Sequence, residues 1–268
     1  MKTRAITGFF FVAVMLGSIY LGQYFFSVFF LMLAVFSTAE FYRLVTTESV
    51  RPQWITGLLL ALAIFLPLCL FYLQDADWRF LLFAIPILTF IVIAELYRKK
   101  ANPFHNMAYT IFGVLYSAVP FAFFYAMAFH GGTYSTHFPL AFLIMLWGSV
   151  TGAYLFGSKL GKNKLFERHS PKKTWEGFFG GMLTSGVAAF IISRYFTDLS
   201  FSGWLGISVI IVVIGSYGDL AESMLKRSLN AKDSGTLLPG HGGLLDRFDG
   251  LLLAAPLVFV YLQLLDTF

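Results

Sequence analysis

Residues 54–73 read WITGLLLALAIFLPLCLFYL, an unbroken run of uncharged and mostly apolar residues. At about 1.5 Å per residue, a helix of this length covers about 30 Å, which is the hydrocarbon thickness of a bilayer. The composition of the whole chain agrees, because 58% of its 268 residues are hydrophobic, 12% are charged and the mean hydropathy is +0.75. A soluble domain carries about 25% charged residues, so a water-soluble fold is excluded.

Eight further segments have the same character, at 6–21, 24–41, 80–97, 107–129, 138–157, 175–193, 202–219 and 250–266. Together the segments predict an all-α polytopic integral membrane protein with about nine transmembrane helices. We expect a single membrane domain over 1–268, with N-terminal helices in 1–146 and the chemistry-bearing half in 147–268. Lys2 and Arg4 resemble the start of a signal peptide, but no small-residue cleavage pattern follows, so the first helix should remain. With Cys69 alone, no internal disulfide can form.

The basic residues gather on alternate connections between the predicted segments. With the N-terminus in the cytoplasm, seventeen of the 19 Lys and Arg residues fall on one side, and only Arg79 and Arg194 fall outside it. Cytoplasmic connections are enriched in Lys and Arg. The pattern therefore predicts a cytoplasmic N-terminus and, after nine crossings, a C-terminus outside. Orientation also accounts for the net charge of +5 without a nucleic-acid partner.

Two connections on the cytoplasmic side, about 158–174 and 220–249, are longer than the others and rich in charge, Gly, Pro and His. A plain solvated loop is the alternative interpretation. Against it, Asp219 follows the apolar run ISVIIVVIGSYG at the membrane boundary, where an ionisable side chain is costly without a partner. Asp246 and Asp249 are three residues apart at the start of the last segment. On a helix they would share one face and could converge on one cation.

A glycine-rich turn, Pro239-Gly240-His241-Gly242-Gly243, precedes these two acids. Glycine permits positive φ and the close approach of backbone N–H groups to a ligand, so such a turn before a helix suits a phosphate group. Four basic residues accompany it, namely Lys226, Arg227, Lys232 and Arg247. Cations and N–H groups for phosphates, with carboxylates for Mg²⁺, are the chemistry of a nucleotide site.

The same stretch resembles the signature of the phosphatidate cytidylyltransferases, also called CDP-diacylglycerol synthases. The resemblance is carried over 27 residues by Ser223-x-Leu225-Lys226-Arg227-x4-Lys232-Asp233-x-Gly235-x-x-Leu238-Pro239-x-His241-Gly242-Gly243-x-x-Asp246-Arg247-x-Asp249. A second block is similar to that family in Ala153-Tyr154-x-x-Gly157-x3-Gly161-Lys162 and in Ser170-Pro171-Lys172-Lys173-Thr174-Trp175-Glu176-Gly177-x-x-Gly180-Gly181. The specific resemblance covers about 147–250, and 1–146 resembles the family in hydropathy and length only.

The resemblance implies a Mg²⁺-dependent nucleotidyltransferase that transfers a cytidylyl group from CTP to phosphatidate, giving CDP-diacylglycerol and pyrophosphate for phospholipid synthesis. It also implies an active site at the cytoplasmic face of a bacterial inner membrane, in contact with membrane lipid. A homodimer and a second bound cation are both possible and stay open. By similarity, Asp219, Asp246 and Asp249 would bind the metal and, with Lys226, carry catalysis. Substrates would be bound by Ser170, Lys172, Lys173, Ser223, Arg227, Lys232, Asp233, His241, Gly242, Gly243 and Arg247.

One position departs from the family pattern. Where the family usually has an Asp ahead of the Ala-Tyr pair, this chain has Val150, in Trp147-Gly148-Ser149-Val150-Thr151-Gly152-Ala153-Tyr154. The missing carboxylate leaves a weakened or inactive structural relative as an alternative to the enzyme. An ion or lipid transporter with Asp219 and Glu95 on its path is a third interpretation, which the gathering of ionisable residues at one membrane face disfavours.

The remaining ionisable residues are expected to be structural. Glu40 and Glu95, near the ends of early helices, should be paired or interfacial. For His241, contact with the nucleotide and stabilisation of the turn both stay open, and orientation is the alternative role of Lys172 and Lys173. A zinc site is not expected, because no metal-ligand spacing links His105, His130, His137 and His169.

Overall fold

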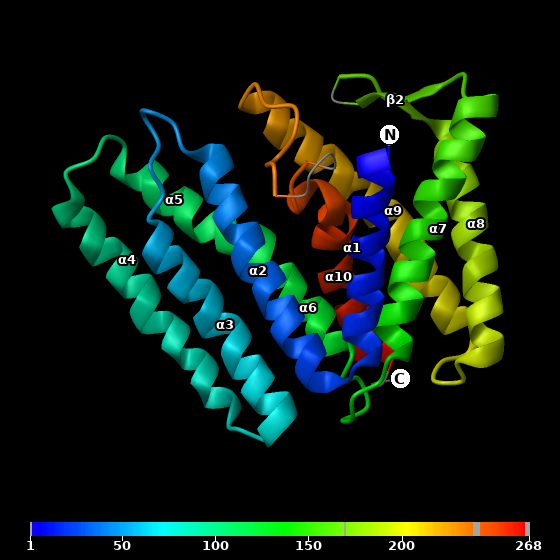
Figure 1. Cartoon of the computed structure of the whole chain (residues 1–268), viewed down its shortest axis with the longest axis horizontal. Coiled ribbons are helices and arrows are strands. Elements are labelled where there is room, and N and C mark those ends of the chain that lie inside the picture. The colour runs from blue at the N-terminus through cyan, green and yellow to red at the C-terminus, as the bar shows by residue number, and fades with distance from the viewer. Residues whose placement is uncertain (1, 169, 238–241, 266–268) are drawn as a thin grey trace. The chain divides into compact units, whose positions relative to one another are not determined.

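The structure is a computed structural model that describes residues 2–168, 170–237 and 242–265 (Figure 1). Most described residues are helical. The helices are α1 (Lys2–Tyr20), α2 (Gln23–Val45), α3 (Trp54–Gln74), η1 (Trp78–Phe83), α4 (Ala84–Arg98), α5 (Pro103–Gly113), η2 (Val114–Ala118), α6 (Val119–Met127), α7 (His137–Leu160), α8 (Trp175–Tyr195), α9 (Phe201–Ser228) and α10 (Leu245–Leu265). Two short strands, β1 (Lys164–Phe166) and β2 (Ser170–Thr174), lie between α7 and α8.

Eight helical stretches of the described residues are long and apolar enough to cross a membrane. Two of them are composite: η1 continues into α4 over Trp78–Arg98, and α5, η2 and α6 form one rod over Pro103–Met127. In α1 the apolar part, Thr7–Tyr20, is shorter. Each of the nine predicted segments contains a helix, so the prediction of an all-α polytopic membrane protein is confirmed.

The predicted connection 220–249 is shorter than expected. α9 continues to Ser228, past the boundary predicted at 219, because residues 220–228 read LAESMLKRS and consist mostly of strong helix formers. An i,i+4 ion pair between Glu222 and Lys226 supports this extension. α10 begins at Leu245 instead of 250. Seven predicted site residues therefore lie on these two helices, namely Asp219, Ser223, Lys226, Arg227, Asp246, Arg247 and Asp249.

The predicted connection 158–174 contains a β-hairpin that hydropathy did not indicate. β1 and β2 pair antiparallel, with Lys164 opposite Thr174 and Phe166 opposite Ser170. Thr174 then caps α8, since its side-chain oxygen accepts a hydrogen bond from the N–H of Gly177 at 3.2 Å. β2 therefore runs directly into α8, which begins where the sequence predicts.

The chain divides into two compact units. The first comprises 1–134 together with 229–247, and the second comprises 135–228 together with 248–268. The division therefore falls in the connection ahead of α7, and the connection after α9 belongs with the N-terminal helices.

In the first unit α2 packs against α3 and α6, and its core is aromatic. Phe26, Phe30 and Tyr125 are fully buried, and the hydroxyl of Ser27 donates to Tyr125 Oη at 2.9 Å. Closer to the other end of α2, Tyr42 Oη donates to the carbonyl of Thr110 at 2.6 Å. α3 carries a glycine, Gly57, where a Cβ would overlap the Tyr42 ring, so α2 and α3 approach closely there.

In the second unit α7 packs on α8, and α8 packs on α9. Small residues let α7 and α8 meet backbone to backbone, since a Cβ at Gly152 would lie 2.8 Å from the carbonyl oxygen of Gly180. Between α8 and α9 the hydroxyl of Ser208 donates to Ser185 at 3.0 Å. These contacts fix the helices whose ends carry the predicted site residues.

Candidate active site

The last turns of α9 carry four residues of the predicted site, Asp219, Ser223, Lys226 and Arg227. Asp219 Oδ2 lies 2.6 Å from the Nζ of Lys173, which comes from β2. The hydroxyl of Ser223, one turn further on, donates to Asp219 Oδ1 at 3.4 Å. Next to them Lys226 pairs with the buried carboxylate of Glu222. Helical spacing and the hairpin together bring these charges to one end of α9.

Asp249 joins this group from α10. It is partly buried, and it interacts electrostatically with Asp219, Lys173 and Lys226. Its Oδ1 accepts a hydrogen bond from the N–H of Gly250 at 2.6 Å. Residues that are far apart in the sequence therefore form one mixed-charge cluster in the second unit, and we call Lys173, Asp219, Lys226 and Asp249 the charge cluster.

The charge cluster offers ligands that suit Mg²⁺. In enzymes that act on phosphates this ion is held by one or two carboxylates together with substrate oxygens and water, and Asp219 and Asp249 provide two carboxylates. Within the described residues, no group of three or more His, Cys, Asp or Glu side chains is arranged to hold a metal ion. Because Asp219 and Asp249 provide two carboxylates, they fit an ion that is shared with a phosphate substrate.

The hairpin fixes Lys173 beside Asp219. Lys173 is the last residue before Thr174, the cap of α8, and its Nζ also lies 3.4 Å from the carbonyl oxygen of Ser216 on α9. Just ahead of β1, the backbone N–H of Lys162 and the side-chain amide of Asn163 donate hydrogen bonds to Glu176 in the first turn of α8, at 3.1 Å and 2.7 Å. The hairpin is therefore tied to α8 at both of its ends.

Asp246, the third predicted metal ligand, is held within the first unit. Its Oδ2 accepts hydrogen bonds from the N–H of Ser234 at 2.9 Å and from the N–H of Gly243 at 2.8 Å, and it lies 2.9 Å from the hydroxyl oxygen of Ser234. Asp246 lies one helical turn before Asp249 on α10, as the sequence predicts. The N–H of Gly243, predicted to face a phosphate, serves this carboxylate in the structure.

Behind Asp246 lies Glu40, which comes from α2. Its Oε1 accepts hydrogen bonds from the Ser234 hydroxyl at 2.7 Å and from the N–H of Leu245 at 2.9 Å, and its Oε2 accepts one from the N–H of Leu244 at 2.9 Å. The expectation that Glu40 is paired is thus confirmed. The identity of its partners could not be read from the sequence, and Ser234 occupies a position that the signature leaves open.

The other predicted substrate-binding residues differ in position and exposure. Gly242 has φ of 82°, a left-handed conformation that favours glycine. Ser170 opens β2. His241 lies outside the described residues. The side chains exposed at the surface are those of Lys172, Arg227, Lys232, Asp233 and Arg247.

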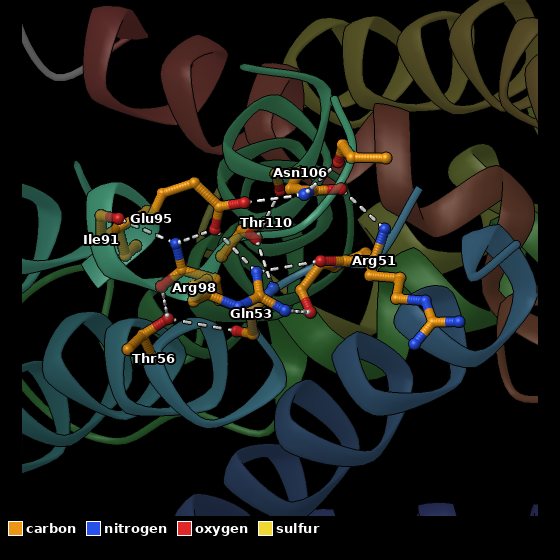
Figure 2. A network of polar contacts seen from close by, with 10 residues as sticks. Arg51, Gln53, Thr56, Ile91, Glu95, Arg98, Asn106 and Thr110 are labelled. Carbon is orange, nitrogen blue, oxygen red and sulfur yellow. Dashed lines mark hydrogen bonds and ion pairs between the residues drawn. The ribbon is translucent and has the colours of Figure 1, made fainter. Parts of the chain in front are cut away.

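Glu95 belongs to a separate polar network in the first unit (Figure 2). One carboxylate oxygen accepts from the side-chain amide of Asn106, and the other accepts from Gln53 and Arg98, each at 2.7 Å. Arg98 also donates to the backbone carbonyl of Arg51 at 3.0 Å. The expectation that Glu95 is paired is confirmed, and its network joins α4 and α5 to the segment before α3.

Val150, which replaces the expected Asp, lies on α7 in the second unit. It is 62% exposed. This side chain is therefore not enclosed by the rest of the protein.

Comparisons with known proteins cover the whole chain. The model of the cytidylyltransferase family matches residues 2–265. A protein of Staphylococcus epidermidis named phosphatidate cytidylyltransferase is 36% identical over 268 residues, and one of the same name from Staphylococcus haemolyticus is 32% identical over 268 residues. Both alignments cover 98% of this chain and 99% of the relative. A relative of that name from Staphylococcus aureus is 39% identical over 178 residues, which is 65% of this chain and 66% of that protein.

Proposed function

The chain belongs to the cytidylyltransferase family, and from this premise we propose that it transfers the cytidylyl group of CTP to phosphatidate, forming CDP-diacylglycerol and pyrophosphate. Two relatives that match nearly its full length are named phosphatidate cytidylyltransferase. The structural observation that supports the proposal most directly is the charge cluster at the ends of membrane-spanning helices. A lipid substrate and a soluble nucleotide must meet at such a boundary.

In the proposed reaction a phosphate oxygen of phosphatidate attacks the α-phosphorus of CTP. The bond from that phosphorus to the oxygen bridging to the β-phosphate breaks, and pyrophosphate leaves. Both reactants are polyanions, so the protein has to align them and offset their charge. Lys173 and Lys226 provide two cations for this task, and we assign Arg227, Lys232 and Arg247, which are exposed, to phosphate contacts.

We further propose that Asp219, Asp246 and Asp249 bind Mg²⁺, with room for a second cation between protein and phosphates. When bound, Mg²⁺ offsets the negative charge that develops on the phosphate oxygens during transfer. Lys173 keeps one oxygen of Asp219 oriented through their ion pair. The donor groups of Ser234 and Gly243 orient Asp246 in the same way.

We place the protein in the inner membrane of a bacterium, with the N-terminus and the site residues on the cytoplasmic side and the C-terminus outside. The asymmetry of the basic residues supports this orientation. It is also the side on which CTP would be available to the reaction.

In spite of Val150, the other signature residues favour a slower enzyme over an inactive relative. The residues that the family resemblance assigns to catalysis, Asp219, Lys226, Asp246 and Asp249, are all present. A chain that had lost the activity would be expected to have lost more of them.

Purified full-length protein tests the proposal directly. In detergent with Mg²⁺, it should release pyrophosphate only when both CTP and phosphatidate are present, and the lipid product should carry the cytidylyl group. Reactions that lack phosphatidate serve as the control. A monodisperse preparation that releases no pyrophosphate with both substrates over a range of Mg²⁺ concentrations would refute the proposed function.

A further inference from the structure

Glu40 is a buried acid in a helix long enough to span the membrane. Only 8% of its surface is exposed, and a carboxylate in such a place is costly unless hydrogen bonds compensate its charge. The three hydrogen bonds that compensate it come from Ser234, Leu244 and Leu245, about two hundred residues later in the chain. A side chain of α2 therefore stabilises the connection that precedes α10.

Glu40 accepts hydrogen bonds at the N-terminus of α10. The first N–H groups of an α-helix have no partner within the helix, and a negative charge near them is favourable. Leu244 and Leu245 stand at the start of α10, and both N–H groups donate to Glu40. The next N–H, that of Asp246, lies 3.3 Å from the Ser234 hydroxyl. Glu40 and Ser234 together cap α10 from outside its own sequence.

Two glycines of the connection leave room for this carboxylate. A Cβ at Gly243 would lie 2.1 Å from Glu40 Oε1, and a Cβ at Gly235 would lie 2.6 Å from Glu40 Oε2. Real Cβ atoms do not approach an oxygen so closely, so any larger residue at either position would displace Glu40. The connection is shaped around the Glu40 side chain.

Ser234 links Glu40 to Asp246. Its hydroxyl oxygen lies 2.7 Å from Glu40 Oε1 and 2.9 Å from Asp246 Oδ2. A hydroxyl has one proton to donate, so it can serve only one of the two carboxylates at a time. Whenever it donates to Glu40, Asp246 keeps the backbone N–H groups of Ser234 and Gly243 as the donors that orient it.

We infer that Glu40 is a positioning residue for Asp246: it holds the start of α10 and the side chain of Ser234 in place, so that Asp246 is oriented for the metal. This inference rests on the proposed function, in which Asp246 is a metal ligand. Glu40 itself contacts neither substrate nor metal in this role. Removing its charge should therefore raise the Mg²⁺ requirement of the reaction.

The test compares full-length Glu40→Gln with the wild type in two measurements. Hydrogen exchange of the backbone should become about tenfold faster or more at Leu244 and Leu245, because hydrogen bonds to a charged acceptor are lost. The Mg²⁺ concentration for half-maximal pyrophosphate release, at saturating CTP and phosphatidate, should rise by about tenfold. At saturating Mg²⁺ most of the rate should return, which simple destabilisation would not produce.

Glu95→Gln is the matched control. Glu95 is also buried, also lies in the first unit and also accepts several hydrogen bonds, but its partners are Gln53, Arg98 and Asn106. This variant should leave both the exchange at Leu244 and Leu245 and the Mg²⁺ requirement at wild-type values. An equal rise in the Mg²⁺ requirement in both variants would overturn the inference, because the effect would then be general.

Ser234→Ala removes the hydroxyl that lies between Glu40 and Asp246 and leaves α2 unaltered. It therefore tests the inference even if Glu40→Gln does not fold. It should also raise the Mg²⁺ requirement, and an unchanged requirement would overturn the inference. The exchange measurement needs no turnover. Unchanged exchange in Glu40→Gln therefore counts against the role of Glu40 alone, whereas a wild type without turnover counts against the proposed function.

Discussion

Replacing Lys173 with Met should impair the proposed reaction, because it removes a cation from the charge cluster while keeping most of the side-chain volume. In the structure Lys173 lies 2.6 Å from Asp219 Oδ2, and it also interacts with Asp249. Without it, Asp219 and Asp249 repel one another with one counter-charge fewer. We expect weaker binding of polyanionic substrate together with less well oriented carboxylates.

The size of the effect follows from the exposure of the pair. An exposed ion pair contributes about 0.2–1 kcal/mol, and a hydrogen bond to a charged group contributes about 1.5–3 kcal/mol. The side chains of Lys173 and Asp219 are 24% and 39% exposed, which places their interaction between these cases. A loss of about 1–2 kcal/mol corresponds to a fall of about 5–30-fold in kcat/KM for CTP.

The assay is pyrophosphate release by purified Lys173→Met at several CTP concentrations, beside Lys164→Met as the control. Lys164 is an exposed lysine on the other strand of the same hairpin, so its removal changes the net charge equally without touching Asp219. It should leave kcat/KM within about twofold of the wild type. An equal loss in both variants would show that total positive charge, and not the ion pair with Asp219, supports the reaction.

Three further outcomes are expected. Asp246→Asn and Asp249→Asn should each lower turnover at least about a hundredfold while the protein stays folded. Near-normal activity of either variant at limiting Mg²⁺ would show that the replaced residue is not a metal ligand. A Cys placed at Asn230, which is exposed, should resist membrane-impermeant thiol reagents in intact cells, with little background because Cys69 is buried; efficient labelling would reverse the orientation. Val150→Asp should raise the rate, since Gly152, Ala153 and Tyr154 keep the family pattern and only the carboxylate is absent. An unchanged or lower rate in a protein of unaltered thermal stability would contradict this.

Hydropathy predicts the helices well. The apolar segment 54–73 corresponds to Trp54–Gln74, and the segment predicted from 175 begins at Trp175, where Thr174 makes the cap within four residues. The proximity of Asp246 and Asp249 also follows from spacing on one helix. Each of these features depends on residues that are close in the sequence.

The features that could not be predicted depend on long-range contacts. Nothing near Glu40 in the sequence identifies Ser234 or Leu244 as its partners, because the contact forms only after α2 and the connection before α10 have packed together. A charge within an apolar segment was the only available signal. Likewise, the end of α9 was misplaced because hydropathy marks where apolar residues stop, whereas the helix continues through the polar pair Glu222 and Lys226.

The way the hairpin joins α8 determines where the chain can change in length. Along a strand successive side chains face opposite sides, and here Lys173 is partly buried while Lys172 is exposed. Because Thr174 is locked as the cap of α8, a residue inserted between Lys173 and Thr174 would take the position of Lys173 beside Asp219 and turn Lys173 to the opposite face of β2. An insertion after Glu167, between the strands, leaves β2 in place relative to α8. Natural or engineered loop extensions should therefore be tolerated at the tip of the hairpin and rejected at its base.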